Sequence, residues 1–409
     1  MTAPATRAVM AALTAEGAEA RFVGGCVRDS VLDRAVKDID IATHEPPERV
    51  MELLDRAGIR AIPTGIEHGT VTAVVAEEHF EITTLRLDVK TYGRRAEVAF
   101  TEDWSEDAAR RDFTINALSL TEDGTLFDPF GGLDDLAAGR IRFVGDAETR
   151  IREDVLRILR FFRFVAYYGQ PPVDAEALAA IDKLSHLIPG LSGERVWSEL
   201  IRLLLAPDPA DVFKLMADHG VLAELFDAEV WITRLAAMVE IERQKSLGEE
   251  SPDPLRRLAA VLKLHRAGAT WTAARLRLSR KERRRLEDMV DDARAVKPES
   301  GPHEARVAIY KLGSDRFRDA VCLAWASARA GGGAGRLEAG FAALLAHVAA
   351  WPPPVLPVRG EDAVGIGIPA GPAVGEALAR VEAWWIEEDF APDREACLTR
   401  LEAIAGPGE

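Results

Sequence analysis

The chain has 409 residues and a net charge of −16 at pH 7, with 48% hydrophobic and 29% charged residues. A chain of this length is expected to form two to four domains, because a single core rarely grows so large. The three cysteines lie far apart and form no CxxC pair, which argues against a disulfide framework or a zinc site and suits a reducing compartment. No apolar run approaches the length of a membrane span, and the N-terminal apolar patch lacks the basic flank of a signal peptide. The sequence therefore predicts a cytoplasmic protein that does not bind membranes.

Residues 21–120 combine short strand-like runs with helical ones. The strand-like runs are rich in Val, Thr and Ile, whereas the helical runs begin after Gly or near Pro. Strands are predicted at 21–25, 37–43, 69–76 and 79–86, and helices at 26–34 and 46–58. The last two strands form a predicted hairpin. The first 140 residues therefore predict an α/β fold.

From about residue 150 onward the strand pattern stops. Helices are predicted at 152–169, 174–184, 193–206 and 208–220, and the helical pattern continues to the C-terminus. Candidate joints lie where Gly and Pro are densest, at 297–304, 330–335 and 351–358. The sequence predicts a small α/β head that carries a long all-helical body.

The first candidate site combines Gly24, Gly25 and Arg28 with Asp38 and Asp40. Two glycines at a strand-to-helix turn let backbone N–H groups approach a triphosphate, and Arg28 adds a charged fork for the same phosphates. Asp38 and Asp40 share one face of the second predicted strand, because side chains alternate along a strand. Two carboxylates this close raise each other's pKa unless a cation lies between them. Such a pair, together with phosphate oxygens, suits Mg²⁺.

Each of these signals has a simpler alternative. A pair of glycines is usually only a turn, and an isolated DxD pattern also occurs in surface strands and helix caps. The two patterns together, about ten residues apart, favour a nucleotide site with two metal ions, one activating a hydroxyl and one holding the triphosphate. Glu81 is a candidate third carboxylate, although a charge on the rim of the site is the simpler interpretation.

A second constellation comprises RRDFTINAL (110–118) and the helix predicted at 152–169. On that helix the apolar residues recur at the spacing of a buried face: Val155, Ile158, Leu159 and Phe162. The complementary side carries Asp154, Arg157, Arg160 and Arg163. Asp154 and Arg157 have the spacing of an ordinary i,i+3 ion pair. Three arginines on one stripe are more than a single aspartate needs, so the stripe is a candidate site.

The negative net charge argues, taken alone, against a nucleic-acid partner. The segment RLRLSRKERRR (275–285) departs from that average, since it holds a single acidic residue. Its basic residues are Arg275, Arg277, Arg280, Lys281, Arg283, Arg284 and Arg285. A solvated helix face is the simpler interpretation of such a run, and contact with an RNA backbone is the alternative.

Taken in chain order, these motifs resemble those of the class II tRNA nucleotidyltransferase and bacterial poly(A) polymerase family. The resemblance rests on GGCVRD, DID, RRDFTINAL, DPFGGLDDL with GRIRFVGD, EDVLRILRFFRF and SGERVWSEL, which span roughly residues 20–205. It extends more loosely through LRLSRKERRRLE and the C-terminal RGEDAVGIGIPAGPAVGEALARVEAWW. The segment 86–107 departs from the family pattern, and its role stays open. No His-Asp dipeptide occurs, so the accessory HD phosphohydrolase domain of the family is not apparent.

The resemblance implies an α+β fold in four parts. These are a nucleotidyltransferase head with a mixed sheet (1–140) and an all-helical neck (141–206), body (207–296) and tail (297–409). It implies that Gly25 and Arg28 hold the incoming triphosphate, and that Asp38 and Asp40 bind Mg²⁺ and carry the catalysis. The residues implied to contact the nucleotide are Arg111, Asp154, Arg157, Arg160 and Arg163. Nucleotide selection then lies in the neck and tRNA binding in the tail.

Hydrogen bonding explains how such a site chooses its bases. Cytosine and adenine both present an amino donor beside a ring-nitrogen acceptor. The carboxylate of Asp154 accepts from the amino group and Arg157 donates to the ring nitrogen, whereas uracil and guanine turn a carbonyl toward Asp154. Each such match is worth about 1–3 kcal/mol. One pair of side chains thus accepts C and A without a nucleic-acid template.

The sequence therefore predicts a CCA-adding tRNA nucleotidyltransferase, which adds CMP, CMP and AMP to the 3′ end of tRNA from CTP and ATP. A poly(A) polymerase of the same family is the alternative. The lack of a long basic C-terminal tail and the acidic net charge favour CCA addition. A small-molecule nucleotidyltransferase would not need so long a helical body, and a catalytically dead RNA-binding module would not need both aspartates. No particular oligomeric state is predicted.

Overall fold

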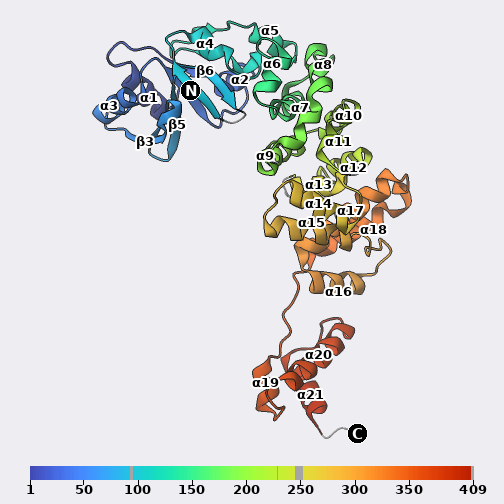
Figure 1. Ribbon diagram of the computed structural model, residues 1–409. Coiled ribbons are helices and arrows are strands. Elements are labelled where there is room, and N and C mark those ends of the chain that lie inside the picture. The colour runs from blue at the N-terminus through green and yellow to red at the C-terminus, as the bar shows by residue number, and fades with distance from the viewer. Residues whose placement is uncertain (93–94, 228, 245–251, 407–409) are drawn as a thin grey trace. The chain divides into compact units, whose positions relative to one another are not determined.

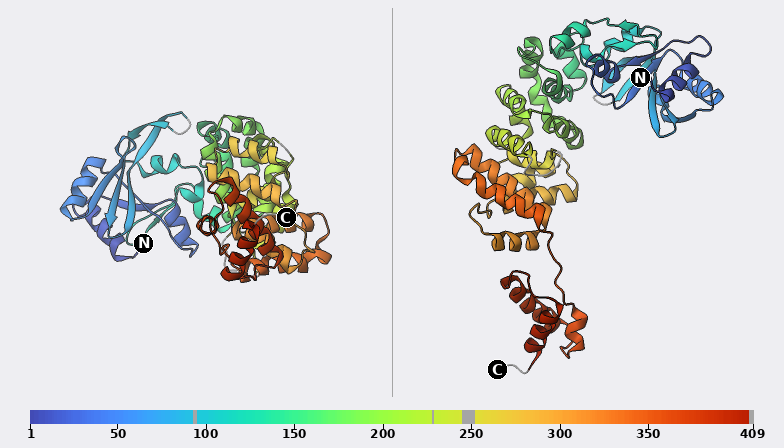
Figure 2. Two further views of the ribbon diagram at one scale, coloured as in Figure 1. Left: turned by 90° about the horizontal axis from the view of Figure 1, so that it is seen from below. Right: turned by 180° about the vertical axis from the view of Figure 1, so that it is seen from behind.

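The computed structural model describes residues 1–92, 95–227, 229–244 and 252–406 (Figure 1). The chain divides into two compact units, Met1–Asp227 and Ala228–Glu409. Every strand of the described residues lies in the first unit, between Ala20 and Phe127, and helices follow from there to the C-terminal end (Figure 2). The predicted α+β class, a mixed sheet followed by helices, is confirmed. The predicted boundaries of the neck, body and tail stay predictions.

The main sheet of the first unit has seven strands in the order β3-β4-β5-β2-β1-β8-β9. The strands are β1 (Ala20–Val23), β2 (Ile39–Thr43), β3 (Arg60–Gly65), β4 (Thr70–Val75), β5 (Glu78–Thr84), β8 (Ser119–Leu120) and β9 (Leu126–Phe127). β2 and β5 run parallel, and the other neighbouring strands are antiparallel. The four predicted strands correspond to β1, β2, β4 and β5, and the last two form the predicted antiparallel pair.

Helices connect and cover these strands. They are α1 (Pro4–Thr14), α2 (Gly25–Val31), α3 (Pro47–Arg56), α4 (Trp104–Ala109) and α5 (Gly132–Ala137). α3 starts with Pro47 in its first turn and buries Val50, Leu53 and Leu54 at helical spacing, which packs it against the sheet. A separate pair of strands, β6 (Arg86–Tyr92) and β7 (Arg95–Phe100), occupies most of the segment 86–107. Residues 93–94 of that segment lie outside the described residues.

The remaining helices of the first unit are α6 (Ala147–Glu153), α7 (Arg157–Tyr168), α8 (Ala175–Leu184), α9 (Gly193–Leu204), α10 (Pro209–Asp218) and α11 (Val221–Leu225). The prediction of one helix over 152–169 is wrong, because α6 ends and α7 begins on either side of Asp154. Asp154 has φ −151° and ψ 104°, and its Oδ1 accepts a hydrogen bond from the Leu156 amide at 3.2 Å. Such a local bond competes with the helical hydrogen bond. The predicted apolar face survives on α7, where Ile158 and Phe162 are buried.

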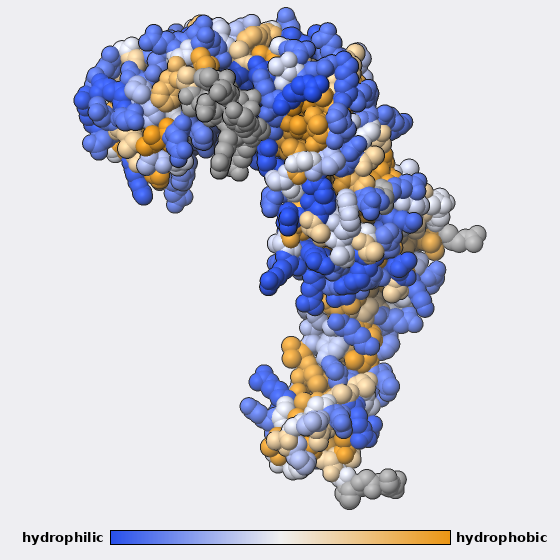
Figure 3. Space-filling model, in the orientation of Figure 1, coloured by the Kyte–Doolittle hydropathy of each residue, from blue (hydrophilic) through white to orange (hydrophobic). Residues whose placement is uncertain are grey.

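The described part of the second unit is helical. Its helices are α12 (Ile232–Glu242), α13 (Pro254–Val261), α14 (Arg266–Arg275), α15 (Arg280–Asp292), α16 (Pro302–Leu312), α17 (Ser314–Ala330), α18 (Ala334–Ala350), α19 (Gly360–Gly365), α20 (Pro372–Glu387) and α21 (Arg394–Ala405). The last three helices share a small core around Val381, Trp385 and Leu401. Hydrophilic residues dominate the face in Figure 3, and hydrophobic ones reach it among α19 to α21. No helix within the described ranges is long and apolar enough to span a membrane.

Candidate active site

The two predicted catalytic aspartates lie where β2 begins. Asp40 is on β2, and Asp38 directly precedes the strand. In the parallel β2–β5 pair, Asp40 is in register with Glu81, so the predicted third carboxylate lies beside it. Burial raises the pKa of Asp40, the charges of Glu81 and Asp38 raise it further, and Arg111 opposes the shift. A cation bound beside Asp40 would oppose this upward shift of its pKa.

This set of donors fits a metal that takes part of its ligands from a substrate. Mg²⁺ is commonly held by one or two carboxylates together with phosphate oxygens and waters. Across the described ranges of the chain, no three His, Cys, Asp or Glu side chains are close enough together to hold a metal ion. The residues present therefore fit Mg²⁺ that binds jointly with a triphosphate.

Two arginines flank the glycine turn between β1 and α2. Gly24 has φ 72°, and a Cβ there would lie 2.7 Å from Nη1 of Arg111, so only glycine leaves Arg111 in place. Arg28 is 7% exposed and donates from Nε and Nη2 to the carboxylate of Asp29 at 2.9 and 3.0 Å. Its Nη1 donates to Oδ1 of Asn116 at 2.5 Å. All three guanidinium nitrogens of Arg28 are therefore hydrogen-bonded within the protein.

Asn116 continues a chain of hydrogen bonds from α2 to α7. Its Nδ2 donates to Oδ1 of Asp112 at 2.9 Å, and Nε of Arg160 donates to Oδ2 of Asp112 at 2.7 Å. Burial alone would raise the pKa of Asp112, but the charge of Arg160 and the bond from Asn116 hold it below the ordinary value. Arg163 and Arg160 lie 2.7 and 3.7 Å from the carboxylate of Glu199 on α9. The structure thus links Arg28 of α2 to Arg160 and Arg163 of α7, which lie more than 130 positions later in the sequence.

Asp154 and Arg157 do not pair with each other. Asp154 pairs with Arg195 of α9 at 2.7 Å, and Arg157 pairs with Glu153. Because Asp154 lies in the break between α6 and α7, the i,i+3 geometry of a continuous helix does not apply to it. Arg157 also donates to the backbone carbonyl of Arg150 at 2.9 Å.

A cavity of about 560 Å³ opens beside the aspartates. Of the residues predicted from the sequence, the ones that line it are Gly25, Arg28, Asp38, Asp40 and Arg163. Within the described residues, the lining does not include four other predicted residues, namely Arg111, Asp154, Arg157 and Arg160.

Three cations that line this cavity were not predicted: Arg34, Lys37 and Arg202. Lys37 directly precedes Asp38, so the sequence did contain a signal for it. Arg34 lies after α2, and Arg202 comes from α9, more than 160 positions later. Only the folded chain brings Arg202 to the aspartates.

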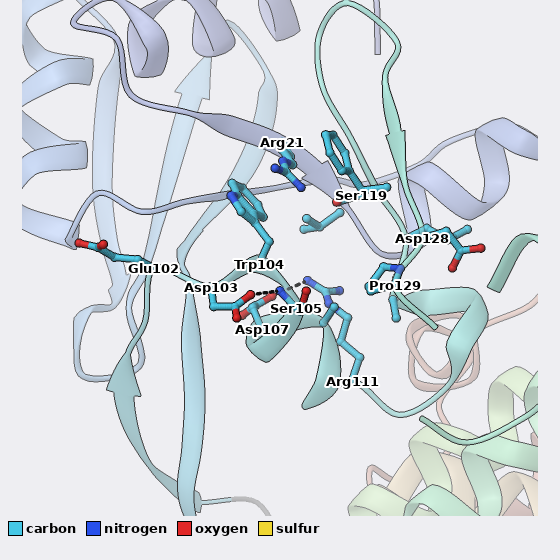
Figure 4. Close-up of a pocket in the computed structure, with 15 residues that line it drawn as sticks. Arg21, Glu102, Asp103, Trp104, Ser105, Asp107, Arg111, Ser119, Asp128 and Pro129 are labelled. Atoms are coloured by element: carbon cyan, nitrogen blue, oxygen red, sulfur yellow. Dashed lines mark hydrogen bonds and ion pairs between the residues drawn. The ribbon is translucent and has the colours of Figure 1, made fainter. Parts of the chain in front are cut away.

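Arg111 lines a second cavity, of about 700 Å³ (Figure 4). Figure 4 shows α4 on one side of this cavity and residues 128–129 on the other. The guanidinium of Arg21 lies 4.0 Å from the ring centroid of Trp104 and 3.6 Å from that of Phe127, so it contacts two aromatic rings. Arg111 thus joins this cavity to the carboxylates of β2.

The basic segment 275–285 lies in the second unit and spans two helices. α14 ends at Arg275, and α15 begins at Arg280 behind a capping box formed by Ser279 and Glu282. Arg277, between the helices, has a positive φ of 55°.

Part of the charge of this segment is neutralised within the protein. Arg283 pairs with Glu287 at 2.9 Å, and Arg285 lies 2.8 Å from Asp253 and 2.7 Å from Asp319. The exposed basic side chains of the segment are Arg277, Arg280, Lys281, Arg283 and Arg284. The interpretation as a solvated helix face therefore applies to only part of the segment 275–285.

Comparison with known proteins identifies the class. Residues 20–142 match the poly A polymerase head domain, and residues 172–229 match the probable RNA and SrmB-binding site of polymerase A. The chain is 34% identical to CCA tRNA nucleotidyltransferase 1, mitochondrial, of Homo sapiens, over 94% of this chain and 87% of that protein. It is 40% identical over 229 residues to the CCA-adding enzyme of Geobacillus kaustophilus, which covers 55% of each chain. The chain belongs to the CCA tRNA nucleotidyltransferase family, which confirms the resemblance of its motifs.

A solved structure agrees with this assignment. The crystal structure of Bacillus stearothermophilus CCA-adding enzyme in complex with CTP superposes with a TM-score of 0.74 at 28% identity, covering 98% of both chains. The likeness extends over the whole chain, and is not confined to the head.

Proposed function

We propose that this chain is a CCA-adding tRNA nucleotidyltransferase, which adds CMP, CMP and AMP to the 3′ end of tRNA from CTP and ATP. The observation that carries the proposal is the cavity in which Asp38 and Asp40 meet cations of α7 and α9, in a chain of this family. The names of the relatives support tRNA as the acceptor, and the CTP complex of the Bacillus stearothermophilus enzyme supports the nucleotide.

Asp38 and Asp40 are the proposed catalytic residues and the ligands of Mg²⁺. When bound, Mg²⁺ would make the 3′-hydroxyl a better nucleophile and neutralise charge on the triphosphate. The 3′-oxygen forms a bond to the α-phosphorus, the bond from that phosphorus to the bridging oxygen breaks, and pyrophosphate leaves with the electron pair. The hydroxyl proton passes to water.

Gly25, Arg28 and Arg111 are proposed to contact the incoming nucleotide. Gly25 and Arg28 line the cavity beside the aspartates, and Asp29 and Asn116 fix the orientation of Arg28. A guanidinium held in this way loses little side-chain entropy when it meets a phosphate.

Base choice is proposed to lie on Asp154 and Arg157, with Arg160 and Arg163 supporting the same region. Arg195 takes one oxygen of the Asp154 carboxylate, and a carboxylate has about four acceptor sites. Asp154 therefore keeps the capacity to accept from the amino group of C or A. The networks of Arg160 with Asp112 and of Arg163 with Glu199 hold α7 in place for this contact.

We place tRNA contacts on the exposed basic side chains of 275–285, and the tail remains a further candidate for tRNA binding. The cytoplasm is the proposed location, supported by three free, buried cysteines and by the cysteine spacing. The human relative carries a mitochondrial name.

The test uses purified protein, tRNA that lacks its 3′ CCA, and each labelled nucleoside triphosphate in turn. Incorporation of CTP and ATP that ends after three nucleotides would support the proposal. Open-ended incorporation of ATP would assign the chain to the poly(A) polymerases of the same family instead.

A further inference from the structure

The cavity beside the aspartates contains more positive charge than its own carboxylates neutralise. Five cations line it, namely Arg28, Arg34, Lys37, Arg163 and Arg202, against three carboxylates, namely Asp29, Asp38 and Asp40. Arg28 is neutralised by Asp29, and Arg163 by Glu199 outside the lining. Three cations and the two catalytic aspartates are left.

The three remaining cations have no carboxylate partner among the described residues. We call them the uncompensated cations: Arg34, Lys37 and Arg202. Within the part of the chain that the structure describes, Lys37 and Arg202 form no side-chain hydrogen bond or ion pair, and the one hydrogen bond of Arg34 goes to the backbone carbonyl of Tyr167 at 3.0 Å. Arg34, Lys37 and Arg202 are exposed, so their N–H groups are accessible to an anion that enters the cavity.

The end of α7 holds two of these cations in place. The guanidinium of Arg34 lies over the ring of Tyr168 at 4.6 Å from its centroid, and the Tyr168 hydroxyl donates to Asp29 at 2.8 Å. The Tyr167 hydroxyl donates to the carbonyl of Arg202 at 2.9 Å. Tyr167 thus holds the backbone of Arg202 on α9. Tyr168 holds the guanidinium of Arg34, in the loop after α2.

Repulsion between the cations acts on Arg163, which lines the same cavity. Burial lowers the pKa of Arg163, and the charges of Arg160 and Arg202 lower it further against the opposing effect of Glu199. An anion in the cavity would relieve this repulsion.

We propose that Arg34, Lys37 and Arg202 bind the β- and γ-phosphates of the incoming nucleotide and hold the pyrophosphate that leaves. The inference rests on the proposed function, since it assigns to these three residues the β- and γ-phosphates of the nucleotide substrate. Arg28, which is also proposed to contact the triphosphate, is held by Asp29 and Asn116. The uncompensated cations have their donors available, and pyrophosphate carries several negative charges within the reach of one cavity.

Isothermal titration with inorganic pyrophosphate, in magnesium buffer and without RNA, tests this directly. Arg202→Gln and Lys37→Gln are each expected to weaken pyrophosphate binding about tenfold, the loss of one charge-assisted contact. Arg202→Lys keeps the charge and is expected to lose less than Arg202→Gln. Lys214→Gln is the matched control, because Lys214 is an exposed lysine of the same unit, on α10, away from the cavity lining.

The same variants also separate pyrophosphate from RNA phosphate as the anion. The inference predicts an increased KM for CTP and unchanged affinity for tRNA. Weaker tRNA binding with unchanged pyrophosphate binding would assign the cations to the RNA backbone and overturn the inference. Wild-type protein that binds no pyrophosphate would overturn it as well. Neither result would overturn the proposed function. That function is tested separately, by measuring CCA addition by the wild-type protein.

Discussion

The two units each contain a charged cavity of nearly the same size, and the two differ in how their charges are paired. The cavity of the first unit, of about 560 Å³, holds the two aspartates and the uncompensated cations. The cavity of the second unit, of about 570 Å³, is lined by six basic and four acidic side chains: Arg256, Lys281, Arg284, Arg285, Arg316, Arg318, Asp253, Asp288, Asp315 and Asp319.

Most charges of the second cavity are neutralised by their neighbours. Asp319 is 2% exposed and accepts from Arg256 at 3.1 Å and from Arg285 at 2.7 Å. Arg285 also reaches Asp253 at 2.8 Å, and Arg316 lies 2.9 Å from Asp288. The two cavities are alike in volume, and each is lined by two more basic than acidic side chains. The pairing of the charges therefore separates a ligand site from a structural network.

The largest expected effect is on the chemistry of the first cavity. Asp38→Ala or Asp40→Ala should reduce nucleotide transfer by about a thousandfold or more, because the carboxylates that hold Mg²⁺ at the reacting phosphate are lost. Binding of tRNA, measured by filter retention, should be almost unchanged. Near-wild-type turnover of either variant in magnesium would show that the metal assignment is wrong.

The next effect is on the stability of the second unit. Asp319→Ala removes the buried carboxylate that Arg256 and Arg285 share, and breaking a buried pair of this kind typically costs about 3–5 kcal/mol of unfolding free energy. Asp315→Ala is the matched control, because its side chain lines the same cavity but is 96% exposed, and its loss should change stability by less than about 0.5 kcal/mol. Chemical denaturation followed by circular dichroism compares the two. Equal stability of both variants would contradict the view that this cavity is a structural network.

A smaller and more specific effect is expected on base selection. Asp154→Ala removes the acceptor for the amino group of C or A and the group that repels the carbonyl of U or G. Discrimination between CTP and UTP should fall by roughly ten- to a hundredfold, more than total activity falls.

Arg195→Ala separates this role from a structural one. If Asp154 serves only to fix Arg195 of α9, both variants should be slow and equally faithful, as judged by competition between CTP and UTP. A slow Asp154→Ala variant that keeps the wild-type preference for CTP would remove base selection from this residue.

The smallest effect concerns the exposed part of the basic segment 275–285. Lys281→Gln with Arg284→Gln should weaken tRNA binding and flatten the slope of log affinity against log salt by about 0.9 unit for each lost phosphate contact. Arg283→Gln should change the slope less, because Arg283 lies 2.9 Å from its partner Glu287 whereas Arg284 lies 3.7 Å from Asp288. An unchanged slope in the double variant would leave the segment as a solvated helix face.

Local patterns allowed much of the fold to be predicted. Four strands of the head, β1, β2, β4 and β5, follow from β-branched residues and alternation, and the apolar face of α7 follows from helical periodicity. Asp38 and Asp40 line one cavity, although Asp38 precedes the strand that was predicted to hold both residues. The helix break at Asp154 was missed, because a bond between its carboxylate and the Leu156 amide replaces helical geometry without any Gly or Pro to signal it.

Partners distant in the sequence were beyond prediction. Arg195, Glu199 and Arg202 all come from α9, which packs against α7, and each changes the expected role of a residue elsewhere. Arg195 takes the carboxylate expected to pair with Arg157, and Glu199 neutralises Arg163. No spacing in the chain encodes such contacts, because they depend on how two helices pack.

The most direct test of the account is the sequence of the RNA end that the protein makes. Purified protein is mixed with tRNA lacking its CCA end and with all four nucleoside triphosphates at equal concentration, and the 3′ ends are sequenced. The account predicts that nearly all extended molecules end in CCA, with no U or G and no further nucleotide. Ends with adenosine tracts of variable length, or with U and G among the added nucleotides, would contradict it.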